Sequence, residues 1–142
     1  MPRAGNVSWI CPGLTVERTN PVPETTELLH SNLYEVFSER DPERRRAAIG
    51  RTYMEDVTFI DPDGEFVGRQ ALSDRAQELL DGASTGDVFE EDGPMYVGTD
   101  TAALAWRFGP PGKPVARGVD ILTIRDGRVS AVRTLIAPES DA

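Results

Sequence analysis

Hydrophobic positions in the first half of the chain recur at the spacing of amphipathic helices. We predict that the first helix begins near Pro23 and buries one apolar face made of Leu28, Leu29, Leu33, Val36 and Phe37. Asp41 followed by Pro42 is typical of a helix start, so we predict a second helix that ends near Arg51. The same pattern returns over residues 69–81, where we predict a third helix.

After the second helix the period of the pattern changes to two, which indicates β-strands. Residues 57–60 predict a short strand and residues 65–68 a brief extended piece, with the turn sequence Asp61-Pro62-Asp63-Gly64 between them. Four longer strands are then predicted over residues 87–97 (broken at Gly93-Pro94), 101–108, 115–125 and 128–136. The Asp126-Gly127 pair before the last strand is a strong hairpin signal.

Helices followed by hairpin-connected strands predict an α+β fold with a curved, mostly antiparallel sheet. Such a sheet must bury one face, and the three helices are available to cover it, so we expect an apolar pocket between the two layers. Residues 1–22 show neither period and are predicted to form an irregular N-terminal arm. Residues 23–142 are predicted to form a single domain.

Charge and composition narrow the classes of partner. The 142 residues contain 24 Asp and Glu against 15 Lys and Arg, a net charge of −9, which disfavours nucleic acid and membrane surfaces as partners. A single cysteine and a single histidine exclude an ordinary zinc site. Because the sequence shows neither a membrane-spanning stretch nor the apolar core of a signal peptide, we expect a cytoplasmic protein.

Asp120 lies in the most apolar stretch of the predicted sheet, and strand alternation places no other charge on its face, which carries Ala116, Gly118, Leu122 and Ile124. Loss of hydration among aliphatic side chains raises the pKa of a carboxyl group and favours the neutral acid. A neutral acid in a cavity can donate a hydrogen bond to a carbonyl or enolate oxygen. The alternative is a structural pairing of Asp120 with Arg107 or Arg133 from neighbouring strands.

Asp61 ends the first predicted strand and has two interpretations. An aspartate before Pro-Asp-Gly is a common turn starter. Its position on the face of Val57 and Phe59 also suits a general base at the edge of a pocket. Two carboxylates in different environments form the pattern that separates a catalytic base from a catalytic acid.

Aromatic side chains on the strands have a similar double interpretation, as core packing or as a flat apolar ligand slot. The candidate ligand-binding residues are Phe59, Phe89, Trp106, Phe108 and the neighbouring Leu122. The phenols of Tyr34 and Tyr53 could each point inward. The triplet at residues 44–46 is typical of a solvated helix face, with an anion site as the alternative, and His30 is interpreted as an ordinary helix histidine or a proton shuttle.

The order and spacing of several motifs resemble the SnoaL-like branch of the nuclear transport factor 2-like superfamily. The matching segments are Tyr34–Phe37 with Asp41-Pro42, Tyr53–Pro62, Gly68–Leu72, Gly118–Asp120 and Asp126–Val129. The resemblance spans residues 26–136 and implies a cone-shaped α+β barrel, an internal pocket and a homodimer. Relatives in this superfamily include ketosteroid isomerases and polyketide cyclases.

Similarity to the isomerases implies that Asp61 is the general base and Asp120 the protonated oxyanion-hole acid. Their helical phenol maps nearest Leu33, so Tyr34 or Tyr53 would have to take its place. The expected function is isomerisation or cyclisation of an apolar carbonyl compound, polyketide- or steroid-like, without a cofactor. The alternative is a non-catalytic ligand-binding or dimerisation module. Epoxide hydrolases match less well, because Arg117 falls on the opposite face from Asp120.

Overall fold

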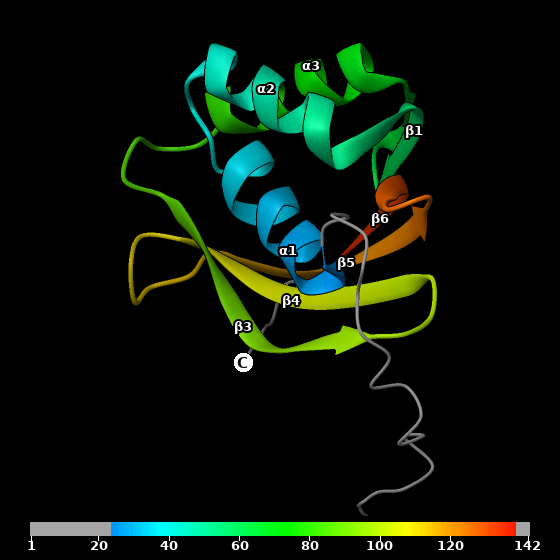
Figure 1. Cartoon of the computed structure of the whole chain (residues 1–142). Helices are drawn as coiled ribbons and strands as arrows, with labels where there is room; N and C mark the ends of the chain where they lie inside the picture. The colour runs from blue at the N-terminus through cyan, green and yellow to red at the C-terminus, as the bar shows by residue number, and fades with distance from the viewer. Residues whose placement is uncertain (1–23, 139–142) are drawn as a thin grey trace, which may run out of the picture.

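The computed structural model describes residues 24–138, and the predicted N-terminal arm lies outside the described residues (Figure 1). The helical segments are α1 (Thr25–His30), which runs directly into the π-helix η3 (Ser31–Phe37), then α2 (Pro42–Thr52) and α3 (Arg69–Asp81). The strands are β1 (Tyr53–Asp61), β2 (Gly64–Val67), β3 (Val88–Val97), β4 (Thr101–Gly109), β5 (Ala116–Arg125) and β6 (Arg128–Ile136). The predicted helices and strands are therefore present, with differences at several boundaries.

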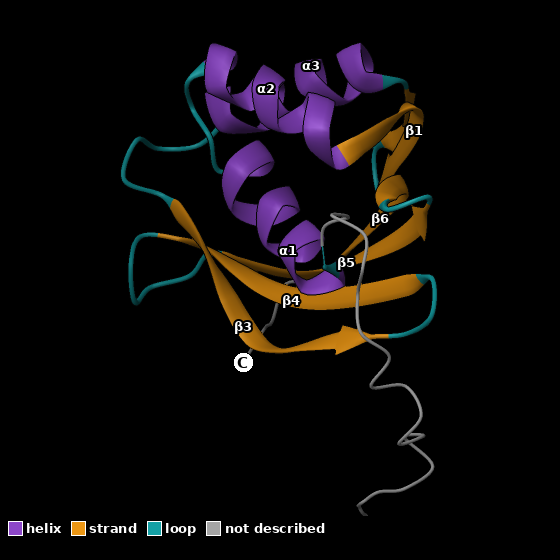
Figure 2. Ribbon diagram, viewed as in Figure 1, coloured by secondary structure: helices purple, strands orange, loops and turns teal. Residues whose placement is uncertain are grey.

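The six strands form one curved sheet in the order β2-β1-β6-β5-β4-β3, and the helices pack over one face of it (Figure 2). All neighbours are antiparallel except β1 and β6, which run parallel. The architecture is the predicted α+β fold with a mostly antiparallel sheet. The described strands do not close into a barrel, because β2 and β3 remain unpaired edges at opposite ends of the order.

Two strands differ from the predicted ones because irregular pairing hides their period. β1 begins at Tyr53 rather than Val57, and its register with β6 shifts between Tyr53 and Thr58. β3 continues through the predicted break at Gly93-Pro94, since an irregularity between Glu91 and Met95 accommodates it.

The first helix changes to π geometry over its second half. The Ser38 hydroxyl donates to the Leu33 carbonyl at 2.7 Å, five residues earlier. Single π segments in helices are often found at functional sites. Here the segment buries Asn32 together with the predicted apolar residues Leu33, Val36 and Phe37. A polar amide is thereby placed inside the core beside the sheet.

A bulge in the β5–β6 hairpin decides which residue faces Asp120. Next to the turn, Arg125 pairs with Arg128, but the register shifts by one residue after Ile124. Asp120 consequently lies opposite Thr134 instead of Arg133. Without the bulge, the hairpin register would have placed the arginine there.

The arginine triplet of α2 is not a uniformly solvated face. Arg44 and Arg46 are exposed, whereas Arg45 is 2% exposed. Its guanidinium donates to the Glu39 carbonyl and to the side chain of Gln77 on α3. Arg45 therefore joins α2 to α3, and the predicted surface role is wrong for this one residue. No helix within residues 24–138 is long and apolar enough to cross a membrane.

Candidate functional site

A cavity of about 420 Å³ lies between the helices and the concave face of the sheet. This volume falls within the range of small-molecule sites, roughly 300–1,000 Å³. Its apolar wall is Phe37, Phe59, Pro62, Leu79, Leu80, Phe89, Trp106, Phe108, Ala116 and Ile136, and its polar wall is Asp61, Asp63, Arg75, Asp120 and Thr134. Both predicted carboxylates thus line the same cavity.

Aromatic rings form two packed groups in the cavity wall. On β3 and β4, Phe89 lies edge-on to Trp106 at 5.2 Å between ring centroids and 4.5 Å from Phe108. In the second group, Phe59 of β1 packs against Phe37 of the π-helix, with 5.1 Å between the ring centroids. Four of the predicted ligand-binding residues therefore line the cavity. The fifth, Leu122, is fully buried in the core and does not reach it.

Asp120 is 6% exposed and accepts three side-chain hydrogen bonds. Its Oδ1 accepts from Trp106 Nε1 at 3.0 Å and from Thr134 Oγ1 at 2.7 Å, and its Oδ2 accepts from Asn32 Nδ2 at 2.8 Å. Burial raises the pKa of Asp120, and the hydrogen bonds from Thr134, Trp106 and Asn32 offset that increase only in part. The alternative pairing with Arg107 or Arg133 is wrong.

Arg107 instead pairs with Glu90 and Asp92, on the other face of the sheet from Asp120. The bulge described above removes Arg133 from the position opposite Asp120. The acid is therefore held by neutral donors rather than by a cation.

Tyr53 does not line the cavity but reaches Asp120 through Asn32. It is completely buried, and its hydroxyl donates to Asn32 Oδ1 at 2.5 Å. Burial, followed by the charge of Asp120, raises the pKa of Tyr53 well above its ordinary value. The phenol therefore stays protonated and acts as a donor.

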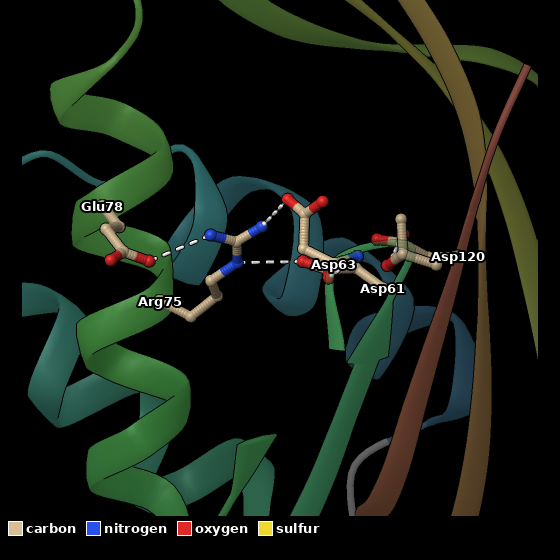
Figure 3. Close-up of polar contacts among 6 residues, drawn as sticks. Asp61, Asp63, Arg75, Glu78 and Asp120 are labelled. Carbon is tan, nitrogen blue, oxygen red and sulfur yellow. Dashed lines mark hydrogen bonds and ion pairs between the residues drawn. The ribbon is translucent and has the colours of Figure 1, made fainter. Parts of the chain in front are cut away.

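Asp61 stabilises the turn that follows β1 and also forms an ion pair with Arg75. Its Oδ1 accepts from the Asp63 backbone N–H at 2.8 Å, and its Oδ2 accepts from Arg75 Nε at 2.9 Å. Arg75 reaches from α3 and also binds Asp63 at 2.7 Å and Glu78 at 2.9 Å (Figure 3). Burial lowers the pKa of Arg75, but the hydrogen bonds to Glu78, Asp61 and Asp63 outweigh it and raise the pKa overall.

Tyr34 and His30 lie away from the cavity wall. The Tyr34 hydroxyl accepts from the Glu91 backbone N–H at 3.1 Å, and the His30 ring packs against Tyr34. The expectation that Tyr34 points into the pocket is therefore corrected, because its hydroxyl is used to join the π-helix to β3. His30 itself is exposed and is not part of the cavity wall.

Three residues of the site were not among the predicted ones. Arg75 and Asn32 interrupt the apolar stripes of their helices, Arg75 three residues after Leu72 and Asn32 three residues after Leu29. A polar residue on an apolar stripe is a signal that could have been used. Thr134 had no such signal, since its position opposite Asp120 depends on the bulge.

Gly118 makes room for Trp106, and we predict that Gly118→Ala will disrupt the Asp120 network. A β-carbon at this position would overlap the indole ring and would lie 2.6 Å from the Leu135 carbonyl. We expect a loss of about 1–3 kcal/mol in the free energy of unfolding, measured by urea denaturation, and a changed Trp106 fluorescence. Ala substitution at Gly86, where nothing lies within 4 Å, is the control. Equal stability of the two variants would contradict the close packing.

Within residues 24–138, no group of three or more His, Cys, Asp or Glu side chains is arranged to hold a metal ion. The chemistry that the described groups offer is hydrogen bonding and proton transfer. A carboxylate beside a guanidinium and a buried carboxyl with a raised pKa face one largely apolar space.

Several solved structures share this fold. A proposed isomerase of the SnoaL-like family from Agrobacterium tumefaciens is 23% identical, with a TM-score of 0.73 over 80% of this chain and 97% of its own. A proposed ketosteroid isomerase from Kribbella flavida is 19% identical, with a TM-score of 0.65 over 88% of this chain and 86% of its own. A proposed SnoaL-like polyketide cyclase from Jannaschia sp. is 16% identical, with a TM-score of 0.66 over 85% of this chain and 91% of its own.

At these identities the likeness shows the fold alone. No curated protein matches the sequence significantly. The model of the SnoaL-like domain matches residues 31–132, which include most of the residues that line the cavity. The chain therefore belongs to the SnoaL-like domain family.

Proposed function

We propose that the protein catalyses a cofactor-independent proton transfer on an apolar carbonyl compound, an isomerisation or cyclisation of a polyketide- or steroid-like ring. The observation that carries the proposal is the pair of aspartates in one aromatic cavity with opposite electrostatic surroundings. Asp61 lies against the Arg75 guanidinium, whereas Asp120 has only neutral donors around it. Such a difference suits a base and an acid in one site.

In the proposed mechanism Asp61 takes the proton from the carbon next to the carbonyl group. Each carboxylate oxygen has two lone pairs, so both Asp61 oxygens keep an acceptor site beside their present partners. The electrons of the C–H bond form the C=C bond of an enolate, and its oxygen receives a hydrogen bond from neutral Asp120. Protonated Asp61 then returns the proton to the same or a conjugated carbon.

The charges of the cavity wall favour an uncharged substrate. Each of the three guanidinium nitrogens of Arg75 already donates to a carboxylate, of Asp61, Asp63 or Glu78. The single positive charge of Arg75 is thus shared among three carboxylates, so it does little to attract an anionic ligand, and the neighbouring aspartates repel one. We expect β-naphthoate to bind at least about tenfold more weakly than the ketone β-tetralone in isothermal titration calorimetry. Tighter binding of the naphthoate would contradict this view of the site.

The experiment that tests the proposed function is α-proton exchange in heavy water. β-Tetralone and cyclic enones are incubated with the protein, and loss of the α-proton signal is followed by NMR against a buffer blank. Exchange faster than the blank supports the base. A measurement of exchange does not require the natural product to be known, because it reports the first chemical step alone.

A binding function without catalysis has one observation in its favour. All four carboxylate oxygens of Asp61 and Asp120 already have a hydrogen-bond partner within the protein. Such a satisfied network can hold a cavity in shape without reacting. Ligand binding by calorimetry together with exchange at the blank rate, for every ketone and enone, would favour the binding module.

A further inference from the structure

Asp120 has two oxygens with different surroundings, and this difference locates its acidic proton. Oδ1 accepts two hydrogen bonds, from Trp106 and Thr134, and therefore uses both of its lone pairs. The indole N–H can only donate, so it cannot take a proton from the acid. Oδ2 accepts one bond, from Asn32, and is the oxygen left to carry the proton of the neutral acid.

Asn32 can hold that proton back or leave it free, depending on which way its amide faces. In the observed orientation the NH₂ group donates to Asp120 Oδ2, so the amide offers the acid no acceptor. With the amide turned over, its carbonyl oxygen would lie against Oδ2 and would accept the acidic proton. The proton would then be bound within the protein and lost to a ligand.

Tyr53 decides between the two orientations. Its buried hydroxyl donates to Asn32 Oδ1, and it has no other hydrogen-bond partner among residues 24–138. Turning the amide over would place the NH₂ group against the phenol and leave the phenolic O–H without an acceptor. A buried polar group without a partner costs about 1–3 kcal/mol, which is enough to hold the amide in place.

We propose that Tyr53 is a positioning residue that locks the Asn32 amide, so that the proton on Asp120 Oδ2 is directed to the ligand. The inference rests on the proposed function and assigns Tyr53 a role without contact to substrate. It also accounts for a buried tyrosine and a buried asparagine, a polar pair at positions where the helix and strand patterns call for apolar side chains.

The test is Tyr53→Phe, which removes the hydroxyl and keeps the ring. We expect the rate of β-tetralone exchange to fall about 10- to 100-fold, because the acid proton turns toward Asn32. In the Asn32→Leu background no carbonyl oxygen remains to take the proton. Tyr53→Phe should then cause no further loss of rate. An equal loss in both backgrounds would overturn the proposal.

A second readout does not depend on catalysis. The side-chain amide resonance of Asn32, assigned with Asn32→Leu, should shift as Asp120 titrates in the wild-type protein. In Tyr53→Phe the amide carbonyl would face the neutral acid and the NH₂ group would turn back toward Asp120 once the acid ionises, so that shift should be larger than in the wild type. If the Asn32 amide resonance shifts equally with the titration of Asp120 in both proteins, the proposal is overturned. This outcome does not depend on whether the protein exchanges the α-protons of any ketone.

Tyr34→Phe is the matched control, since it also removes a phenolic hydroxyl with one hydrogen bond, here from a partly buried side chain. The Tyr34 hydroxyl binds the Glu91 backbone and has no link to Asn32 or Asp120. We expect the exchange rate and the Asn32 resonance to match those of the wild type. If wild-type protein shows no exchange while the Asn32 resonance behaves as expected, the proposed function fails and the lock stands.

Discussion

Replacement of Asp61 by asparagine is expected to lower the rate of β-tetralone exchange by about 10²- to 10⁴-fold, the usual contribution of a general base. Asparagine has nearly the same shape, and its carbonyl oxygen can keep one of the two present bonds, to Arg75 or to the Asp63 backbone. The amide cannot accept a proton from carbon. Binding of β-tetralone by calorimetry should change little, so the loss should fall on the rate.

Glu78→Gln is the control for this substitution. Glu78 binds the same guanidinium at 2.9 Å but is well exposed, and its side chain is not part of the cavity wall. It tests whether a weaker ion-pair network around Arg75 is enough to lower the rate. We expect less than a threefold change for Glu78→Gln, in line with a surface ion pair worth about 0–1 kcal/mol. Equal exchange by Asp61→Asn and wild type would exclude Asp61 as the base.

Replacement of Asp120 by asparagine is expected to change how stability depends on pH. The folded protein raises the pKa of Asp120, so the unfolded carboxyl ionises first as the pH increases. The folded state binds more protons between the two pKa values, and the free energy of unfolding therefore falls as pH rises through that window. The loss is about 1.4 kcal/mol for each pH unit of the window. An asparagine does not ionise and should not show it.

The measurement is urea denaturation of both proteins from about pH 4 to about pH 8. Titration of the other acids is common to the two proteins and cancels in the difference. The variant should gain stability relative to the wild type as the pH rises, whatever constant cost the new amide brings. The exchange rate should drop about 10²-fold, since the enolate loses a donor. A constant stability difference would show that folding does not raise the pKa of Asp120.

The sequence was sufficient to place both aspartates at the pocket, because the position of each follows from residues close to it in the chain. Asp120 follows the alternation of its own strand, and Asp61 ends a strand before a turn, so neither depends on distant pairing. The positions of the helices could be predicted for the same reason, because they follow from nearby residues. The π-helix, in contrast, leaves no sign in the sequence, because Leu29 and Leu33 are spaced as in an ordinary α-helix. The packing of that segment against the sheet is what reveals the role of Asn32.

The partners of the aspartates depend on contacts between distant segments, and the sequence did not identify them. The hairpin rule places Arg133 opposite Asp120, and only a one-residue irregularity substitutes Thr134. Arg75 is separated from Asp61 in the chain by a strand and a helix turn. Their ion pair forms because α3 packs against β1. Open sheet edges, rather than a closed barrel, likewise follow from the final order of strands.

The bulge between β5 and β6 has a consequence for how firmly the register of these two strands is fixed. If the two strands slipped so that every residue paired in register from the turn, Arg133 would lie opposite Asp120 and bring its guanidinium against the acid. The same slip would turn Val132, now fully buried, to the outer face of the sheet. The burial of Val132 in the hydrophobic core therefore disfavours the register in which Asp120 would have a charged neighbour. A hairpin in the slipped register would lose folding stability before it could yield a stable protein with an ion-paired Asp120.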